Sequence, residues 1–422
     1  MGRCWILALM LLHVVSSKAQ YWGEVGGEGR ASRTQGVWIG GGASSFGFSG
    51  SSGSSGFSGS SGSPSSRVSA AYTALQAWKS AITDDPFGIL RSWVGPEVCS
   101  YKGVFCTDVP ESMSPGVVVS AIDLNHANLK GSLVKELSFL SDLSVFHINS
   151  NRFSGTIPDS FRVLEKLSEL DLSNNQLSGP FPSVTLLLPS LIYLDIRFNR
   201  FSGSLPEDLF NRNLDAIFLN DNLFDGQIPQ SLGNSPASVI NFANNRFVGN
   251  IPTSFGYMGP RIKEILFLNN NLTGCIPEGL GLLSEIELLD VSFNSLSGHL
   301  PDTMSCLTEI EVLNLAHNKF TGVIPNVVCS LKNLLNLTLA YNFFSGFSQE
   351  CGSYKNSGFD FTGNCIPGSY MQRPPPECIT TPVNINCLRI PSAGPVSCGS
   401  VDVLERKAVG KRTGKPYRAK TP

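Results

Sequence analysis

The sequence is poor in the residues that catalysis and metal binding need. Its 422 residues include only five histidines, and after His13 the others lie far apart, at His126, His147, His299 and His317. No glycine-rich stretch ends in the Gly-Lys-Ser/Thr of a phosphate-binding loop. No two cysteines have the Cys-x-x-Cys spacing of a zinc site. We therefore expect no enzyme, no cofactor and no metal site.

Long apolar runs and a strong net charge are also missing. After the first segment nothing offers the roughly 18 consecutive apolar residues of a membrane helix, so we expect no transmembrane segment. The net charge is only −2, and we expect no nucleic-acid partner.

Residues 1–19 combine Arg3, an apolar stretch at residues 4–15 and a small-x-small ending at Ala19, which predicts a secretory signal peptide.

What the sequence does contain is one phrase repeated many times. HINSNRFSGTIPDSF at residues 147–161 returns as LAHNKFTGVIPNVVC at residues 315–329. The phrase occurs ten times from Gly131 to Gly346, with its glycines 23 to 25 residues apart. Its form, L-x-L-x-x-N-x-L-x-G-x-I-P, is a leucine-rich repeat. Because one repeat cannot bury its apolar face alone, we predict an α/β solenoid, a leucine-rich repeat horseshoe of about ten 24-residue repeats.

An asparagine recurs at one position of the repeat, and we interpret it as structural. Its amide would point inward and satisfy backbone groups that are freed where each strand bends. Only the first repeat has another residue, Ala127, in this position. The asparagines are Asn151, Asn175, Asn199, Asn222, Asn245, Asn270, Asn294, Asn318 and Asn342.

Composition divides the chain into six segments. After the signal peptide at 1–19, residues 20–66 are rich in glycine and serine, which predicts a disordered linker. A helical N-terminal cap follows at 67–120, the repeats at 121–346, a cysteine-rich C-terminal cap at 347–400 and a basic disordered tail at 401–422. Within the first cap, we expect a helix over residues 68–82. Ala71, Leu75, Trp78 and Ile82 would share its apolar face.

Ten cysteines remain once Cys4 is removed with the signal, an even number in a chain addressed to an oxidising compartment. They predict disulfides. Cys99 is close enough to Cys106 for a bond, and a Cys306–Cys329 bond between adjacent repeats about 4.8 Å apart is feasible. The other pairings stay open, including an intermolecular bond. The ten are Cys99, Cys106, Cys275, Cys306, Cys329, Cys351, Cys365, Cys378, Cys387 and Cys398.

Charge is uneven along the chain. Residues 401–422 hold seven Lys or Arg against two acids, and residues 1–66 hold four against two, which leaves −9 on residues 67–400. This division predicts cationic ligands for the repeats. For the tail it suggests a polyanion such as acidic wall polysaccharide, although inert solvated chain explains the same composition.

The solvent-facing strand positions of all ten repeats align as one concave surface, which is typical of a binding module. Acids and aromatic residues share this surface, and such pairs suit a basic peptide. We predict one patch on repeats three to five and a second on repeats eight to ten. The candidate residues are Asp171, Asp195, Phe198, Phe218, Asn220 and Asp221 in the first, and Asp290, Phe293, His317 and Tyr341 in the second.

Several of these stretches are similar to one known family. The runs DLNHANLKG, FHINSNRFSGTIP, LDIRFNRFSGSLP and SPASVINFANNRF resemble the leucine-rich repeat extensin family of plant cell walls, whose repeats are of the plant extracellular type. NCIPG at 364–368 and PVNINC at 382–387 look like the cysteine-rich hinge of that family. The resemblance covers about residues 68 to 400.

The resemblance implies a secreted cell-wall protein that binds basic, cysteine-containing signalling peptides of the rapid alkalinisation factor class. Such a protein would be a homodimer that acts in wall integrity and cell expansion. The chain departs from the family after GKRTGKPYRAKTP, because no Ser-Pro-Pro-Pro-Pro run of an extensin module follows. Retention in the wall through the basic tail is our hypothesis in place of that module.

An alternative function is that of a polygalacturonase-inhibitor-like defence protein, whose partner would be a secreted glycan hydrolase. Such chains should lack the Gly/Ser linker and the hinge.

Two sequons, at Asn271 and Asn336, predict N-glycosylation on the secretory route.

Overall fold

The computed structural model describes residues 66–109, 116–347, 351, 358–379, 387 and 398. The signal peptide, the linker up to residue 65 and the basic tail lie outside the described residues, so those three predictions stay predictions.

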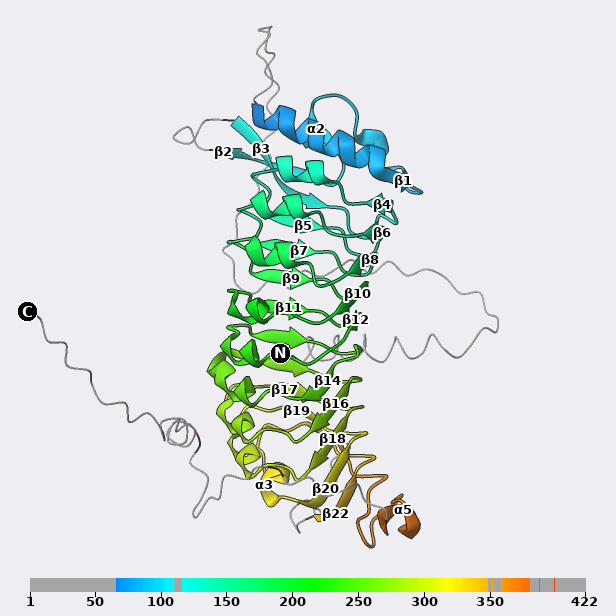
Figure 1. Ribbon diagram of the computed structural model, residues 1–422, viewed down its shortest axis with the longest axis vertical. Helices are drawn as coiled ribbons and strands as arrows, with labels where there is room; N and C mark the ends of the chain where they lie inside the picture. Colours follow the sequence, from blue (N-terminus) through cyan, green and yellow to red (C-terminus); the bar gives the residue numbers. More distant parts are fainter. Residues whose placement is uncertain are drawn as a thin grey trace, which may run out of the picture. The chain divides into compact units, whose positions relative to one another are not determined.

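The main sheet confirms the solenoid, because it takes one strand from each successive repeat (Figure 1). Strand β2 runs antiparallel to β3, and the later strands pair in parallel. Within each strand the L-x-L segment alternates an inward apolar and an outward side chain. In spatial order the strands are β2 (Val104–Val109), β3 (Gly116–Asp123), β5 (Val145–His147), β7 (Glu169–Asp171), β9 (Tyr193–Asp195), β11 (Ala216–Phe218), β13 (Val239–Asn241), β15 (Glu264–Leu266), β17 (Leu288–Asp290), β19 (Val312–Asn314), β21 (Asn336–Thr338) and β23 (Phe359–Asp360).

Two further sheets run beside the main sheet, and the sequence pattern did not predict them. They use the residues that lead to the repeat glycine. The first contains β1 (Ile82–Asp84), β4 (Lys130–Ser132), β6 (Arg152–Gly155), β8 (Gln176–Gly179), β10 (Arg200–Gly203) and β12 (Leu223–Phe224). The second contains β14 (Val248–Asn250), β16 (Asn271–Gly274), β18 (Ser295–Gly298), β20 (Lys319–Ile324) and β22 (Phe343–Phe347).

From the second repeat to the ninth, the chain returns through a short helix that starts after the proline of the repeat. In the first repeat the helix follows Val134. The preceding glycine makes the turn with a positive φ, as at Gly155 with φ 89°, a conformation that side chains disfavour. Most of these helices are 3₁₀ helices: η4 (Lys135–Phe139), η5 (Asp159–Val163), η6 (Ser183–Leu187), η7 (Glu207–Asn211), η8 (Gln230–Asn234), η9 (Thr253–Arg261), η10 (Glu278–Leu282) and η11 (Asp302–Cys306). The next repeat uses α3 (Asn326–Cys329).

The repeat asparagines form the inward ladder that we expected. Asn151 Oδ1 accepts a hydrogen bond from Leu129 N at 2.8 Å, and its Nδ2 donates to the carbonyls of Leu124 and Ile148 at 2.8 and 2.9 Å. The pattern continues through Asn364, whose Oδ1 accepts from a backbone amide at 3.1 Å. The structural interpretation of these asparagines is confirmed.

The N-terminal end is closed by helix α2 (Ser66–Ala81), which lies across the first repeats (Figure 1). Ala71, Leu75 and Trp78 are buried as predicted, and the Trp78 ring lies 5.6 Å from that of Phe153 in the second repeat. Ile82 was wrongly placed on the helix. It pairs in β1 with Gly131, because the chain turns there to form the edge of the sheet that contains β4. Two 3₁₀ helices, η1 (Ile89–Ser92) and η2 (Val98–Ser100), complete this cap.

All ten cysteines form disulfides, which confirms the predicted framework. The bonds are Cys99–Cys106, Cys275–Cys387, Cys306–Cys398, Cys329–Cys351 and Cys365–Cys378. The Cys306–Cys329 bond that we considered feasible is wrong. These two cysteines end η11 and α3, at nearly equivalent places in successive repeats, so their Cα–Cβ directions run parallel instead of converging. Helix α5 (Pro375–Ile379) follows in this C-terminal region.

Candidate functional site

The side of the main sheet that points away from the apolar core is called the open face here. It carries four rows of side chains. The first and third residues of each three-residue strand belong to it, because the second points into the core. The third and fourth rows lie two and three residues beyond the strand. The predicted candidates came from the strand's third residue and from the fourth row, except Asn220, which lies in the third row.

The fourth row adopts a left-handed backbone in every repeat. Its φ angles lie between 51° and 58° from His126 to Tyr341, although none of these residues is glycine. This conformation is uncommon for bulky side chains. Hydrogen bonds between repeats hold it, as when Phe198 N donates to Asn220 O at 3.0 Å and Asp221 N to Ala243 O at 2.9 Å. The solenoid therefore fixes the direction of these side chains.

Asp195 lies at the centre of the first predicted patch, with no exposed surface. Its carboxylate accepts from Arg197 Nε at 3.0 Å, from Arg197 N at 3.1 Å and from Tyr193 Oη at 3.3 Å. Burial raises the pKa of Asp195 to about 7, against the lowering effect of the Arg197 charge. Asp195 thus positions Arg197 and Tyr193 and presents no oxygen to a ligand.

The two neighbouring aspartates lie nearer the surface. Asp171 accepts from the amide and hydroxyl of Ser173 at 2.9 and 2.6 Å. Asp221 accepts from Asn220 Nδ2 at 2.8 Å and from Asn244 Nδ2 at 2.9 Å, and burial raises its pKa. Both side chains are half-buried, so they can meet a ligand from the open face.

The aromatic residues of the first patch differ in exposure. Phe218 is buried, with the Arg197 guanidinium 5.1 Å above its ring and the Tyr193 ring 5.8 Å away. Phe198 is half-buried in the fourth row. Arg197 covers part of the aromatic floor, so the patch is less purely acidic than the sequence suggested.

Four residues of this patch were absent from the predicted set: His147, Glu169, Tyr193 and Arg197. His147 Nε2 lies 3.1 Å from Glu169 Oε2. The signal that would have found Glu169, Tyr193 and Arg197 is the period of two in a strand, since residues two before and two after each Asp face the same side. His147 occupies the strand position that Asp171 holds in the next repeat. We call the whole group, from His147 to Asp221, the acidic cluster.

The second patch is built around stacked rings. The ring of Phe293 lies 4.1 Å from His317, and His317 lies 4.4 Å from Tyr341, with interplanar angles of 14° and 13°. Asp290 is buried, and its carboxylate accepts from Ser292 N at 2.8 Å and from Asn314 Nδ2 at 3.0 Å. The stack presents ring edges, which differs from the mixed acid and ring surface that we predicted.

The structure does not bring the two patches together. Strands β13 and β15 separate β11 from β17, which places the patches about 15 Å apart at ~4.8 Å per strand.

The two predicted glycosylation sites differ in their surroundings. Asn271 is exposed at the start of β16. Asn336 is half-buried at the start of β21, where its Oδ1 accepts from Thr338 Oγ1 at 3.0 Å. Attachment at either stays a prediction.

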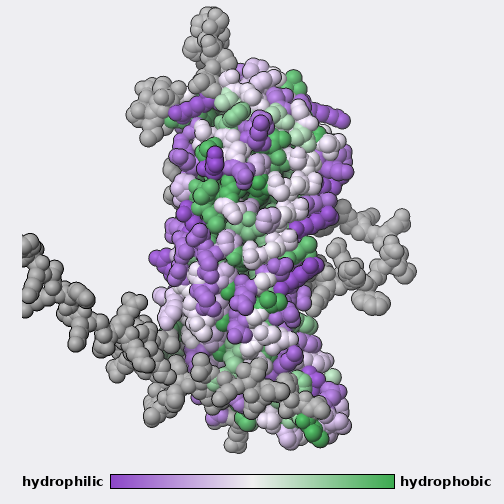
Figure 2. Space-filling view, in the orientation of Figure 1, coloured by the Kyte–Doolittle hydropathy of each residue, from purple (hydrophilic) through white to green (hydrophobic). Residues whose placement is uncertain are grey.

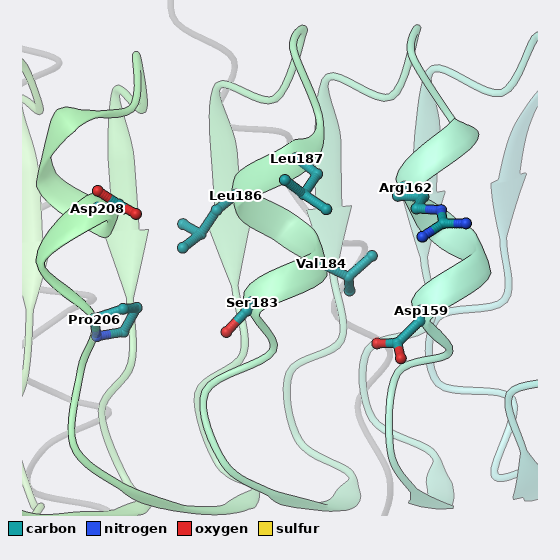
Figure 3. Close-up of a pocket in the computed structure, with 8 residues that line it drawn as sticks. All are labelled: Asp159, Arg162, Ser183, Val184, Leu186, Leu187, Pro206 and Asp208. Atoms are coloured by element: carbon teal, nitrogen blue, oxygen red, sulfur yellow. The ribbon is translucent and has the colours of Figure 1, made fainter.

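A second surface lies on the helical side of the repeats. A groove of about 370 Å³ runs along η5, η6 and η7, with Val184 pointing towards η5 and Leu186 towards η7 (Figure 3). Leu187 beside it is 60% exposed. Figure 2 shows apolar side chains gathered on this part of the molecule. The groove also contains Asp159 and Asp208.

Within the part of the chain that the structure describes, no helix is long and apolar enough to cross a membrane. The same residues contain no group of three or more His, Cys, Asp or Glu that could hold a metal ion. The five disulfides fit an oxidising, extracellular compartment.

Comparison with known proteins agrees with this architecture. The description "Leucine rich repeat N-terminal domain" matches residues 70–107, and "Leucine rich repeat" matches residues 141–201, 285–307 and 309–331. Leucine-rich repeat extensin-like proteins 7 and 6 of Arabidopsis thaliana are 64% and 54% identical to the chain over 230 residues, which is 54% of the chain. In its repeats the chain resembles the plant leucine-rich repeat extensin proteins.

The extensin-like matches cover 52% and 48% of those two proteins, so the chain spans about half the length of the curated relatives it matches. Among solved structures, the Arabidopsis receptor kinase HAESA, in complex with the peptide hormone IDA and the co-receptor SERK1, has a TM-score of 0.56 at 28% identity. That similarity covers 69% of this chain and 53% of the HAESA chain. The likeness is to a scaffold of leucine-rich repeats.

Proposed function

We propose that this protein is a secreted component of the plant cell wall whose open face binds basic, cysteine-containing signalling peptides of the rapid alkalinisation factor class. The observation that carries the proposal is the acidic cluster on β5 to β11. Wall integrity and cell expansion would depend on this binding, and a homodimer is part of the same proposal.

The charge of the acidic cluster favours a cationic ligand. Glu169, Asp171, Asp195 and Asp221 provide four carboxyl groups, and Arg197 provides one permanent positive charge. Because Asp195 is fully buried in contact with Arg197, the half-buried Asp171 and Asp221 are the acids that would meet the ligand. Such rim carboxylates steer a basic partner and hold it through partly desolvated ion pairs.

The similarity to HAESA supports a peptide as the ligand, since that repeat domain was solved with a peptide hormone. The similarity to the extensin-like proteins over the repeats supports a place in the cell wall. The half-buried Tyr193 and Phe198 add aromatic area beside the acids, and rings of this kind supply much of the energy at peptide interfaces.

The experiment is a calorimetric titration of the full chain with a folded rapid alkalinisation factor peptide at physiological salt. The double variant Asp171→Asn/Asp221→Asn should bind about tenfold more weakly, because two charged contacts are lost. The matched control is Asp159→Asn/Asp208→Asn, which removes the same charge from the helical groove and should leave the affinity within about twofold. Equal losses in both double variants, or no binding by the wild type, would refute the proposal.

One observation favours the alternative function as a glycan-hydrolase inhibitor. The groove along η5 to η7 combines exposed apolar side chains with acids, which suits a folded protein partner more than a short peptide. Inhibition of a secreted polygalacturonase by a chain that binds no basic peptide would establish this alternative.

The basic tail at 401–422 supports a further part of the proposal, retention on acidic wall polysaccharide. Salt should release the tagged protein from wall material, and a chain without residues 401–422 should elute at lower salt. Identical elution of the two chains would refute it.

A further inference from the structure

The glutamate that begins β15 is an ionisable group without a partner for one of its oxygens. Glu264 is only 9% exposed, and its Oε2 atom is buried with no hydrogen bond. In register beside it lie Val239 on β13 and Leu288 on β17, and Leu266 follows it on the same face. The carboxyl group therefore lies among aliphatic side chains on the open face, between the two patches.

An ionised carboxylate in such a place is unfavourable, because it has lost its water and gained no counter-charge. Burial raises the pKa of Glu264, and the nearby carboxylate of Glu287 raises it further. Lys263 precedes it in the chain, but its ammonium lies 3.1 Å from Glu285 and 3.3 Å from Glu287. The group therefore keeps its proton more readily than an exposed glutamate.

We propose that Glu264 is the anchor for a lysine or arginine side chain of the ligand, and that Val239, Leu266 and Leu288 contact the aliphatic residues beside that cation. This inference rests on the proposed function and names the residue that selects a basic side chain flanked by apolar ones. It also places the anchor on β15, outside both predicted patches.

The surroundings of Glu264 favour an organic cation over other occupants. Its neighbours in register are aliphatic, and the described part of the chain offers no three-ligand group for a metal ion. Lysine and arginine carry their charge on an apolar stem, so the stem packs on aliphatic walls while the head reaches the carboxylate. The acids Glu287 and Asp290 on the neighbouring repeat disfavour an anion.

A cation favours the ionised form of Glu264, so binding should lower its pKa and release a proton over the pH range in which the free chain keeps that proton. The other titratable groups around it are Glu287, Asp290 and Lys263. On the β13 side, Val239 and Asn241 do not titrate. Proton release that depends on Glu264 is therefore a readout that packing alone would not give.

The test uses the full chain and a synthetic peptide of alternating leucine and lysine, with a norleucine version as the uncharged control. Titration calorimetry of the wild type should show binding that depends on lysine. Glu264→Gln should weaken it by about tenfold or more. Asp208→Asn removes an exposed acid from the helical groove, away from the open face, and should stay within about twofold.

A second variant keeps Glu264 but supplies a cation from within the chain. Asn241 lies diagonal to Glu264 on β13, so Asn241→Arg should occupy the carboxylate and weaken lysine-peptide binding as much as Glu264→Gln does. Titrations in two buffers of different ionisation enthalpy should show proton release for the wild type and none for Glu264→Gln. Circular dichroism checks that each variant is folded.

The outcomes separate this inference from the proposed function. Unchanged lysine-peptide binding by Glu264→Gln, or no lysine-dependent binding by the wild type, would overturn the anchor. A rapid alkalinisation factor peptide is titrated in parallel. Failure of that peptide to bind a chain that holds the lysine peptide through Glu264 would refute the proposed function and leave the anchor standing.

Discussion

Glu169 and Glu264 begin equivalent strands, β7 and β15, and face the same side of the same sheet, yet their surroundings differ. Glu169 lies 3.1 Å from His147, and this contact lowers the pKa of Glu169. Glu264 has aliphatic neighbours and an unsatisfied oxygen, and burial raises its pKa. The same residue type at equivalent strand positions thus has its pKa shifted in opposite directions.

The difference comes from residues on the neighbouring repeat. His147 lies diagonal to Glu169 across the sheet, and Asn241 holds the matching position for Glu264. Although burial lowers the pKa of His147, its hydrogen bond to Glu169 and the charge of Asp171 raise it overall. The neighbour, and not the glutamate, decides whether the acid is a satisfied structural group or an unpaired one.

Asp195 sharpens the comparison, because it has a cation partner and still keeps a raised pKa of about 7. The folded state holds a proton that the unfolded state loses above about pH 4, so the free energy of unfolding falls as pH rises from about 4 to about 7. At about 1.4 kcal/mol per pKa unit, this fall amounts to about 4 kcal/mol. Asp195→Asn should remove it, as measured by urea unfolding at a series of pH values.

The control for that experiment is Asp208→Asn, which changes an exposed acid in the helical groove. It should keep the wild-type pH dependence. An Asp195→Asn profile that parallels the wild type would show that Arg197, and not burial, sets the ionisation of Asp195.

Leucine substitutions at the two glutamates should change the free energy of unfolding in opposite directions. Glu264→Leu removes an unpaired buried acid from aliphatic surroundings and should raise the free energy of unfolding above neutral pH by about 1 to 4 kcal/mol. Glu169→Leu takes the partner from His147 and should lower it by up to about 1 kcal/mol. Urea unfolding of both variants at one pH checks this, and a loss of stability in Glu264→Leu would contradict our account of the site.

A histidine can test whether the diagonal neighbour is sufficient. Asn241→His gives Glu264 the arrangement of Glu169, so the pKa of Glu264 should fall and the variant should gain about 0.5 kcal/mol while the new histidine is charged. This gain should disappear as pH rises through the pKa of that histidine. Titration followed by NMR measures both groups. Thr338→His, which places a histidine on β21 away from Glu264, should leave the Glu264 titration unchanged.

Much of the fold could be predicted because the residues that determine the shape of a repeat lie within a single repeat length. Leu170 and Leu172 point inward, Asn151 bonds the backbone, and Gly155 turns with a positive φ, all within one repeat length. The Cys99–Cys106 bond was accessible for the same reason, since its cysteines have a sequence separation of only 7. The helix end at Ala81 was missed by one residue, because pairing of Ile82 with Gly131 takes over there.

The candidate site was predicted less well. The aspartates were found, but the burial of Asp195 under Arg197 and Tyr193 required contacts along and across strands. Cys306 was matched with the adjacent repeat, whereas its partner is Cys398, at a sequence separation of 92. No local sequence pattern indicates which residues pair over such a large sequence separation.

The sequence by itself determined the period, the inward residues, the asparagine ladder and the set of side chains on the open face, because these depend on spacing within a single repeat. Only the tertiary structure decided which of those side chains are paired, buried or left without a partner. Stacking brings residues about 24 positions apart into contact, and the ionisation of Glu169, Asp195 and Glu264 follows from those contacts.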